Sequence, residues 1–328
     1  MTDTSQPYVN FIYEPIQDQL EMVVESLRRL AGHAKLAGEE GLLEHAVVSG
    51  GKKIRPTVTL LAGALREGPQ GKLVTMATAV ELLHIATLIH DDTIDKADTR
   101  RGRSTISNIW GSDVAVLLGD YVFATSATYV CDTENLRVVR RFSETIMELA
   151  QGELAEYFST HDWGQSIDEY NQRIYNKTAS LFCTAAESGG VLSNASEEEC
   201  QALNRYGYNL GMAFQIMDDL LDYTGTEEEL GKPVGNDLLQ GTVTLPVLLF
   251  AAQNPDLPAM KRLVDGSQEP EDLRAVVDLV RASSVIDESA AMMEAYKQKA
   301  LDALTLLPKH RARESLEALT EYVSHRRV

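Results

Sequence analysis

Apolar positions recur along most of the chain with the three-to-four residue spacing of an α-helix. Residues 14–31 show this spacing, with Leu20, Val23 and Leu27 set among charged side chains. The segment 72–94 is instead apolar almost throughout until its acidic end, which predicts a helix buried on all sides. Similar patterns predict further helices over about 113–131, 134–160, 166–188, 197–224, 244–253 and 283–305.

Glycine and proline clusters separate these segments. They occur at Gly50-Gly51, Gly68-Pro69, Gly189-Gly190, Gly231-Lys-Pro and Asn254-Pro255. We find no strand alternation, low-complexity tract or fixed-period repeat, and aromatic residues make up only 6% of the chain. Since no composition shift marks a boundary, we expect residues 1–328 to form a single all-α domain.

The overall charge narrows the class of protein. The 328 residues include 49 acidic and 30 basic side chains, a net charge of −19, which argues against nonspecific nucleic-acid binding. Cys131, Cys183 and Cys200 are too few and too scattered for a disulfide framework. The N-terminus lacks the pattern of a signal peptide, and no apolar run reaches the ~18 residues of a membrane span. These features predict a cytoplasmic protein without an integral membrane segment.

The pattern DDxxD occurs twice, at 91–95 and at 218–222, each time where a strongly apolar helix ends or is interrupted. Residues four apart lie on one face of a helix, so the first and last aspartates of each copy should point the same way. Carboxylates this close repel unless protons, cations or metal compensate them. Magnesium suits such a site because it combines one or two carboxylates with waters and substrate phosphates.

Two simpler interpretations compete with a metal site. One DDxxD could be a solvated helix end with surplus acid, or a weak calcium loop, although the D-x-D-x-D-G spacing of such a loop is absent. Two copies, each at an apolar helix, favour metal. The six candidate ligands are Asp91, Asp92, Asp95, Asp218, Asp219 and Asp222.

Cationic residues accompany the acidic ones. Arg100 and Arg101 follow the first DDxxD, and guanidinium groups bind phosphate oxygens bidentately. The stretch SGGKKIRP adds Lys52, Lys53 and Arg55 beside glycines that let backbone approach an anion. It lacks the P-loop spacing and could simply be a basic turn that opens a helix at the proline. Metal and basic residues together suggest two phosphorylated substrates in one apolar-walled cavity, with diphosphate as the leaving group.

Five motifs resemble, in the same order, the signatures of the trans-isoprenyl (polyprenyl) diphosphate synthases. They are GGKKIRP, LIHDDTIDKADTRRG, NKTASL, GMAFQIMDDLLDYTG and GKPVGNDL, and they span about residues 49 to 250. The resemblance implies a helical bundle around a deep central cavity, usually homodimeric. It also implies the reaction: magnesium, which manganese can replace, ionises an allylic diphosphate, and the cation alkylates isopentenyl diphosphate in a head-to-tail condensation. Three magnesium ions per substrate-bound site are implied.

The resemblance also assigns roles to residues. Asp91, Asp95 and Asp218 resemble direct magnesium ligands, completed by the other three aspartates. Positions that hold the allylic diphosphate correspond to Arg100, Lys177, Gln215 and Lys232, with Thr178 beside them. Positions of the isopentenyl diphosphate site correspond to Gly51, Lys52, Arg55, His84 and Arg101. His84 lies about two turns before Asp91, on the same helix face. Thr242 stands where many members have lysine, so we expect altered diphosphate affinity.

Product length is predicted from the resemblance as well. Positions four and five before the first aspartate carry Thr87 and Ala86, both small, as in members that make long chains. The helical wheel places Ala86 about 140° from Asp91, so it does not select this residue by itself. Tyr121, Phe123 and Tyr129 are alternative residues for a cavity floor. A linear all-trans product longer than geranylgeranyl, such as a quinone side-chain precursor, is predicted.

Several alternatives stay open. A geranylgeranyl or farnesyl diphosphate synthase differs only in product length, and the catalytic subunit of a heteromeric synthase would need a small partner subunit. A class I terpene cyclase shares the first acidic motif but normally has a mixed Asn/Ser/Glu triad as its second. The sequence leaves the allylic primer, the pathway and the oligomeric state undecided.

Overall fold

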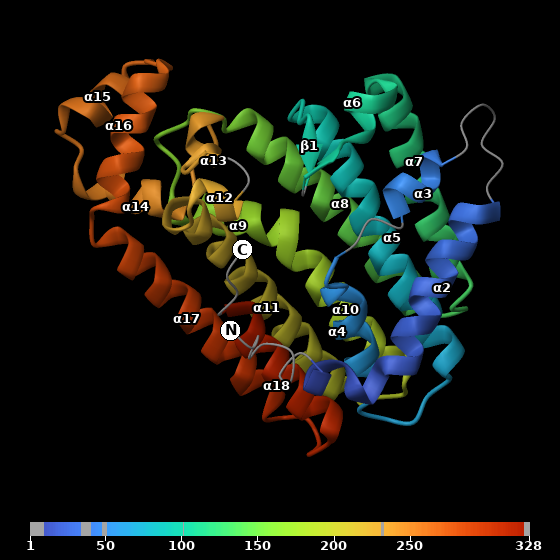
Figure 1. Ribbon diagram of the computed structural model, residues 1–328. Helices are drawn as coiled ribbons and strands as arrows, with labels where there is room; N and C mark the ends of the chain where they lie inside the picture. The colour runs from blue at the N-terminus through green and yellow to red at the C-terminus, as the bar shows by residue number, and fades with distance from the viewer. Residues whose placement is uncertain (1–9, 34–40, 48–50, 101, 231–232, 325–328) are drawn as a thin grey trace. The chain divides into compact units, whose positions relative to one another are not determined.

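The computed structural model describes residues 10–33, 41–47, 51–100, 102–230 and 233–324, which are predominantly helical (Figure 1). The contacts divide the chain into two units. The first comprises Met1–Ser143, Thr184–Asn204 and Leu304–Ala318, and the second Glu144–Cys183, Arg205–Ala303 and Leu319–Val328. The predicted all-α class is confirmed, whereas a single domain over residues 1–328 stays a prediction.

The first unit contains the N-terminal helices and a minimal hairpin. Its elements are η1 (Glu14–Ile16), α2 (Gln17–His33), α3 (Leu42–Val47), α4 (Ile54–Gly63), α5 (Gln70–Ile94), β1 (Thr99–Arg100), β2 (Arg103–Ser104), α6 (Ile106–Trp110) and α7 (Ser112–Cys131). Strand β1 pairs antiparallel with β2, with Thr99 opposite Ser104. The sequence predicted no strand here, because a two-residue strand has no alternation to detect.

Helix α5 is the core of the first unit. Its residues from Leu73 to Ile89 are mostly buried, and it packs against α2, α4 and α7. Both α5 and α7 are long and apolar enough to cross a membrane by length and composition, which is weak evidence by itself. Of the most apolar window, 72% is buried in α5 but only 33% in α7. The apolar sequence of α5 is therefore explained by its burial. Most of the apolar window of α7, in contrast, is not buried.

Gly189 and Gly190, predicted as a break, instead lie inside α10 (Ser180–Leu192). A Cβ atom at Gly189 would lie 2.3 Å from the carbonyl oxygen of Thr59 in α4. The glycine therefore serves close helix packing rather than chain reversal, which is why the prediction of a break was wrong.

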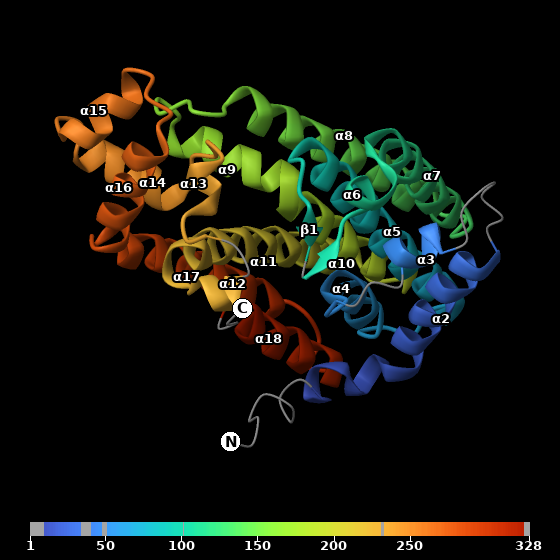
Figure 2. The same cartoon turned by 45° about the horizontal axis from the view of Figure 1, so that its top comes forward.

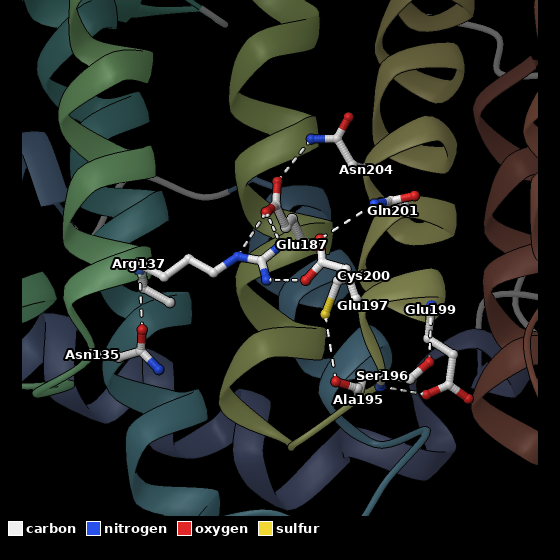
Figure 3. A network of polar contacts seen from close by, with 11 residues as sticks. Asn135, Arg137, Glu187, Ala195, Ser196, Glu197, Glu199, Cys200, Gln201 and Asn204 are labelled. Atoms are coloured by element: carbon white, nitrogen blue, oxygen red, sulfur yellow. Dashed lines mark hydrogen bonds and ion pairs between the residues drawn. The ribbon is translucent and has the colours of Figure 1, made fainter.

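An ion-pair network joins the starts of α8 (Leu136–Phe158) and α11 (Glu197–Thr224) to α10 within the first unit (Figure 3). Arg137 contacts Glu187 at 2.8 Å and Glu197 at 2.5 Å, and Asn204 donates to Glu187 at 2.8 Å. These hydrogen bonds raise the pKa of Arg137 and lower that of Glu197. The network connects three helix segments of the first unit to one another.

The second unit is built on parts of α8 and α11 together with the C-terminal helices. Its further elements are α9 (Ile167–Ile174), η2 (Tyr175–Ala179), α12 (Glu227–Leu230), α13 (Asn236–Leu239), α14 (Leu245–Gln253), α15 (Pro258–Val264), α16 (Pro270–Arg281) and α17 (Val285–Leu304). Helix α18 (Arg311–Ser324) is divided between the two units after Ala318. A buried apolar cluster that includes Ile216, Leu220 and Val276 forms its core. Helix α9 runs beside the C-terminal part of α8 (Figure 2).

The segment 166–188, predicted as one helix, has a more specific structure. Ser166 caps α9 through a capping box with Glu169. The chain then passes through the single π-helical turn η2 before α10 begins. Residues Asn176 to Leu181, one of the five motifs, start within this turn. Single π turns occur frequently at functional sites, so the irregularity singles out this motif.

Candidate active site

The first acidic cluster lies at the C-terminal end of α5. Asp91 falls in the last turn and Asp95 is the C-cap residue, whose backbone N–H donates to the Asp91 carbonyl. The helical geometry thus confirms that these two residues are one turn apart on one face. A helix C-terminus carries partial negative charge, so carboxylates are unfavourable there. This unfavourable placement of carboxylates indicates a role for cation binding at this helix end.

Asp92 has a different environment from its neighbours. It is buried, and its carboxylate accepts a hydrogen bond of 2.7 Å from Nε of Arg100 on β1. Burial raises the pKa of Asp92, and the positive charge of Arg100 opposes that rise. The pair borders a pocket of about 360 Å³ whose other wall includes Ile85 and Leu88 of α5. A charged end beside an apolar wall suits a molecule with an anionic head and a hydrocarbon tail.

The basic segment before α4 forms a second cationic group in the first unit. Arg55 donates from Nη1 to Nε2 of His84 at 3.2 Å, which brings together two residues 29 positions apart. Both were predicted for the isopentenyl diphosphate site. Lys53 instead forms a largely buried ion pair of 3.1 Å with Glu81, so its charge is already balanced. Its predicted contribution to anion binding is therefore reduced.

Backbone geometry shapes this segment further. Lys53 adopts a left-handed conformation with a φ of 47°, at the start of α4. The Tyr13 hydroxyl donates to the Lys52 carbonyl oxygen at 2.8 Å. Gly51 and Lys52 are exposed at this turn. Because α4 begins at Ile54, the proline at position 56 falls inside the first turn, where its missing N–H costs nothing.

Two predicted residues, Arg101 and Lys232, lie outside the described residues. The chain-length candidates are described: Ala86 is buried in α5, and the half-buried Thr87 donates its hydroxyl proton to the His84 carbonyl at 2.8 Å. Tyr121 is exposed, while Phe123 and Tyr129 are half-buried.

The second acidic cluster lies in the last two turns of α11, again at a helix C-terminus. Asp218 is half-buried, whereas Asp219 and Asp222 are buried. The Tyr170 hydroxyl donates to Asp219 at 2.6 Å, and the Gln215 amide donates to the other carboxylate oxygen at 3.0 Å. Burial raises the pKa of Asp219 to about 7 despite these hydrogen bonds. Asp219 is thus enclosed, and Asp218 is the more accessible carboxylate.

A continuous polar chain extends from this cluster into η2. The Thr178 hydroxyl donates to the Gln215 carbonyl oxygen at 2.6 Å, so two predicted residues are in direct contact. Lys177 lies against α8, with its ammonium 3.1 Å from Glu153 and 2.5 Å from Glu156. The predicted contact between Lys177 and a diphosphate remains a prediction, because these carboxylates hold the ammonium here.

Asp222 links α11 to the GKPVGNDL motif. Its carboxylate accepts the Asp237 N–H at 3.1 Å, and its carbonyl accepts the Gly235 N–H at 2.8 Å. Gly235 has a φ of 70°, and a Cβ atom there would lie 2.4 Å from Val277. Thr242, which replaces a lysine common in the resembling family, donates its backbone N–H to the Asp237 carbonyl at 2.8 Å.

The carboxylates fit magnesium on the condition that substrate completes its coordination. Across the described part of the chain, no group of three or more His, Cys, Asp or Glu side chains is arranged to hold a metal ion alone. Magnesium commonly takes only one or two carboxylates and draws remaining ligands from water and phosphate. Asp91 and Asp95 in one cluster, and Asp218 in the other, have that chemistry. Asp92 and Asp219 are engaged with Arg100 and Tyr170.

Sequence analysis did not find Tyr170, Tyr13, Glu153 or Glu156. Tyr170 lies seven residues before Lys177, a spacing that would place both on one face of a regular helix, and that regularity is broken by η2. The two glutamates resemble the other surface acids of α8 until the fold sets them beside Lys177. Their roles depend on contacts between helices.

Comparison with known proteins gives consistent results. Residues 40–280 match the family described as polyprenyl synthetase. Component 2 of the heptaprenyl diphosphate synthase of Bacillus subtilis is 38% identical, over 96% of this chain and 90% of its own length. The crystal structure of heptaprenyl diphosphate synthase from Staphylococcus aureus has a TM-score of 0.90 and 35% identity, and the match covers 95% of this chain and 98% of that one.

A third comparison concerns a structure with bound ligands. The polyprenyl synthase from Caulobacter crescentus, solved in complex with calcium and isoprenyl diphosphate, has a TM-score of 0.89 and 33% identity. The match covers 98% of both chains. The fold found here therefore accommodates a divalent cation and an isoprenyl diphosphate in that protein.

Proposed function

The chain belongs to the polyprenyl synthetase family and is a prenyltransferase, and we propose that it makes a linear all-trans polyprenyl diphosphate longer than geranylgeranyl. It condenses isopentenyl diphosphate with an allylic diphosphate. The observation that carries the proposal is that each unit has an acidic helix end held by polar partners: Arg100 binds Asp92 in the first, and Gln215 links Asp219 to Thr178 of η2 in the second.

Each group has a distinct task in this reaction. Asp91 and Asp95 in the first unit, and Asp218 in the second, are the residues proposed to hold magnesium, which would supply positive charge that stabilises diphosphate as a leaving group. Asp92 holds Nε of Arg100, which leaves the terminal nitrogens of the guanidinium suited to two phosphate oxygens. In the second unit, Lys177 is the residue proposed to supply positive charge to a diphosphate.

The second substrate would bind at the basic segment before α4. The contact between Arg55 and His84 places a guanidinium and an imidazole at one point of the first unit. With Lys52 and Gly51 they form the proposed site for isopentenyl diphosphate, completed by Arg101. Lys232 is proposed for the allylic site. Thr178 and Gln215 hold each other and Asp219, so their role is to position the second cluster.

The long product rests on two kinds of support. Ala86 and Thr87 are small, and a relative and a solved structure are both heptaprenyl diphosphate synthases. A geranylgeranyl or farnesyl product is the alternative. A larger residue at Ala86, five positions before the first acidic cluster, would shorten the product.

Assembly is the finer part of the proposal. Helix α7 leaves Val116, Leu117 and Tyr121 exposed, an apolar surface that supports a homodimer. The Bacillus subtilis relative is named as one component of its enzyme, so a catalytic subunit that needs a small partner is the second candidate. We propose the cytoplasm as the location.

The decisive experiment incubates the purified protein with magnesium, labelled isopentenyl diphosphate and, separately, dimethylallyl, geranyl, farnesyl and geranylgeranyl diphosphates. Products are dephosphorylated and sized by chromatography. Labelled polyprenols longer than geranylgeraniol support the proposal, and shorter ones support the alternative product. Conversion of the allylic substrate to hydrocarbon without label would indicate a cyclase and overturn it. Activity only after a small partner is added would establish the second candidate.

A further inference from the structure

Lys177 lies between two carboxylates of α8. Its Nζ is 2.5 Å from Oε1 of Glu156 and 3.1 Å from Oε2 of Glu153, and each of the three side chains is about one quarter exposed (25%, 25% and 26%). Two negative charges therefore face one positive charge. The pairs are sheltered enough for their attraction to exceed that of fully exposed pairs.

The backbone enforces this arrangement. Gly152 precedes Glu153 on α8, and a Cβ atom there would lie 2.6 Å from the Lys177 nitrogen and 2.9 Å from its Cα. Any larger residue would push α8 and η2 apart. Lys177 itself lies within the π turn, which extends from Tyr175 to Ala179. The contact between lysine and glutamates is thus built by two local features rather than by chance rotamers.

An ammonium with two carboxylates is neutralised before any substrate arrives. A diphosphate that binds Lys177 has to compete with these two carboxylates for the positive charge, and their negative charges repel it. Arg100 differs, because its contact with Asp92 is made through the inner nitrogen Nε. The two cations should consequently contribute in different ways. Arg100 should mainly bind diphosphate, whereas Lys177 should alternate between the glutamate carboxylates of α8 and diphosphate.

We propose that Glu153 and Glu156 are positioning residues that compete with diphosphate for Lys177 and thereby speed release of the inorganic diphosphate product. This deepens the proposed function, since it rests on Lys177 contacting the diphosphate. The carboxylates hold the ammonium in the ligand-free protein, yield it to the allylic diphosphate, and take it back when inorganic diphosphate leaves. Repeated elongation needs that release in every cycle.

The test measures binding of inorganic diphosphate in the presence of magnesium by calorimetry, alongside steady-state kinetics. Glu156→Gln should tighten binding about three- to tenfold, because one competing charge is lost. Glu153→Gln should do the same to a smaller extent. The allylic KM and the inhibition constant of diphosphate should both fall, and kcat should fall if product release limits turnover.

Matched variants separate this effect from a structural one. Glu148→Gln removes a carboxylate from the same helix, where it accepts a hydrogen bond from the Tyr175 hydroxyl at 3.1 Å, and should leave diphosphate affinity unchanged. Glu156→Asp keeps the charge and should restore nearly wild-type affinity. In Lys177→Met the second change Glu156→Gln should no longer tighten binding, which a double-mutant cycle measures.

The outcomes distinguish the two levels of the proposal. If the wild type elongates substrate and Lys177→Met weakens diphosphate binding, but both glutamine variants bind no tighter than wild type, the competition is overturned while the proposed function stands. If Lys177→Met binds diphosphate as the wild type does, the competition is overturned together with the role of Lys177. Absence of any elongation by the wild type, both alone and with a small partner subunit added, contradicts the function itself.

Discussion

The two acidic clusters share one sequence pattern but differ in what surrounds the middle aspartate. In the first, Asp92 binds Arg100, a cation with 38% of its side chain exposed. In the second, Asp219 binds the phenol of Tyr170 and the amide of Gln215, and all of Tyr170 is buried. One carboxylate thus orients a charged group that substrate can reach, while the other belongs to an enclosed neutral network.

The difference shows that DDxxD is not one functional unit repeated. The first cluster should influence substrate affinity through Arg100, and the second should influence stability through buried hydrogen bonds. The outer aspartates, in contrast, should behave alike, because Asp91 and Asp218 both lie at helix C-termini and neither is fully buried. Substitutions can therefore test where the two clusters are equivalent and where they diverge.

The largest expected effect is shared by both clusters. Asp91→Ala and Asp218→Ala should each reduce turnover by about a thousandfold or more, since each removes a proposed metal ligand at the bond that ionises. Stability should stay the same or rise slightly, because an unfavourable negative charge is removed from a helix C-terminus. Initial rates at saturating magnesium provide the measurement. Near-normal rates in either variant would contradict the metal assignment of that cluster.

The next largest expected difference between the two clusters is in how their middle aspartates make stability depend on pH. Because the pKa of Asp219 is raised to about 7 from 3.8, the folded protein binds the proton more tightly than the unfolded chain. Asp219 therefore destabilises the metal-free protein progressively as pH rises from about 4 to 7. Asp219→Asn should be stabilising relative to wild type by roughly 2–4 kcal/mol more at pH 8 than at pH 4. Urea unfolding in EDTA at both pH values measures this difference.

The matching control is Asp92→Asn. Burial also raises the pKa of Asp92, and the positive charge of Arg100 opposes that rise. Its pH-dependent gain should be smaller than that of Asp219→Asn. A gain of equal size in both variants would show that the two environments are not distinct.

Removal of one hydroxyl should affect the second cluster alone. Tyr170→Phe deprives the buried Asp219 of a hydrogen bond of 2.6 Å, and we expect a loss of about 1.5–3 kcal/mol of unfolding free energy at pH 8. Tyr121→Phe, at an exposed tyrosine of α7, is the control. If both variants unfold at the wild-type urea concentration, the network does not stabilise the unit.

The first cluster should respond through affinity. Asp92→Asn removes the charge that orients Arg100, and we expect the KM for the allylic diphosphate to rise about three- to tenfold with a stability change below about 1 kcal/mol. Kinetics with a fixed concentration of isopentenyl diphosphate measure it. An unchanged allylic KM would contradict the orienting role of Asp92.

The smallest effect on the reaction rate is expected from substitutions five positions before each cluster. The one before the first cluster should instead change the length of the product. Ala86 and Ala213 occupy these places, and both are buried. Ala86→Phe should shorten the product, as the resemblance implies, whereas Ala213→Phe should only destabilise a core that has no space for it. Chromatography of dephosphorylated products tests both. An unchanged product spectrum in Ala86→Phe would contradict the chain-length assignment.

The sequence predicted what depends on periodicity. Helices α5, α7 and α11 were expected within a few residues of their ends, and the placement of Asp91 and Asp95 on one helix face was confirmed. Periodicity could not reveal that Gly189 lies inside α10, because a glycine is required there by the close approach of α4, which the sequence does not show. It also could not show that Lys53 is balanced by Glu81, a residue 28 positions away.

The sequence also could not predict contacts between helices at the candidate site. Arg55 and His84 were both predicted, yet their contact depends on how α4 packs on α5. Tyr170 was missed because a buried tyrosine in a helix usually signals only a core position. The ordered motifs identified the chemistry, while the hydrogen bonds that support it became visible only in the folded chain.

The π turn η2 has a consequence for how this segment can change. A π turn contains one residue more than an α-helix needs to cover the same rise, so the chain between Tyr175 and Ala179 holds a surplus residue. Loss of that residue would let α9 and α10 join as one regular helix with complete hydrogen bonding. Every side chain on one side of the joint would then rotate by about 100° relative to the other. Lys177 and Thr178 would then lose their contacts with α8 and α11. A fully regular helix in this segment is therefore incompatible with the arrangement of the site.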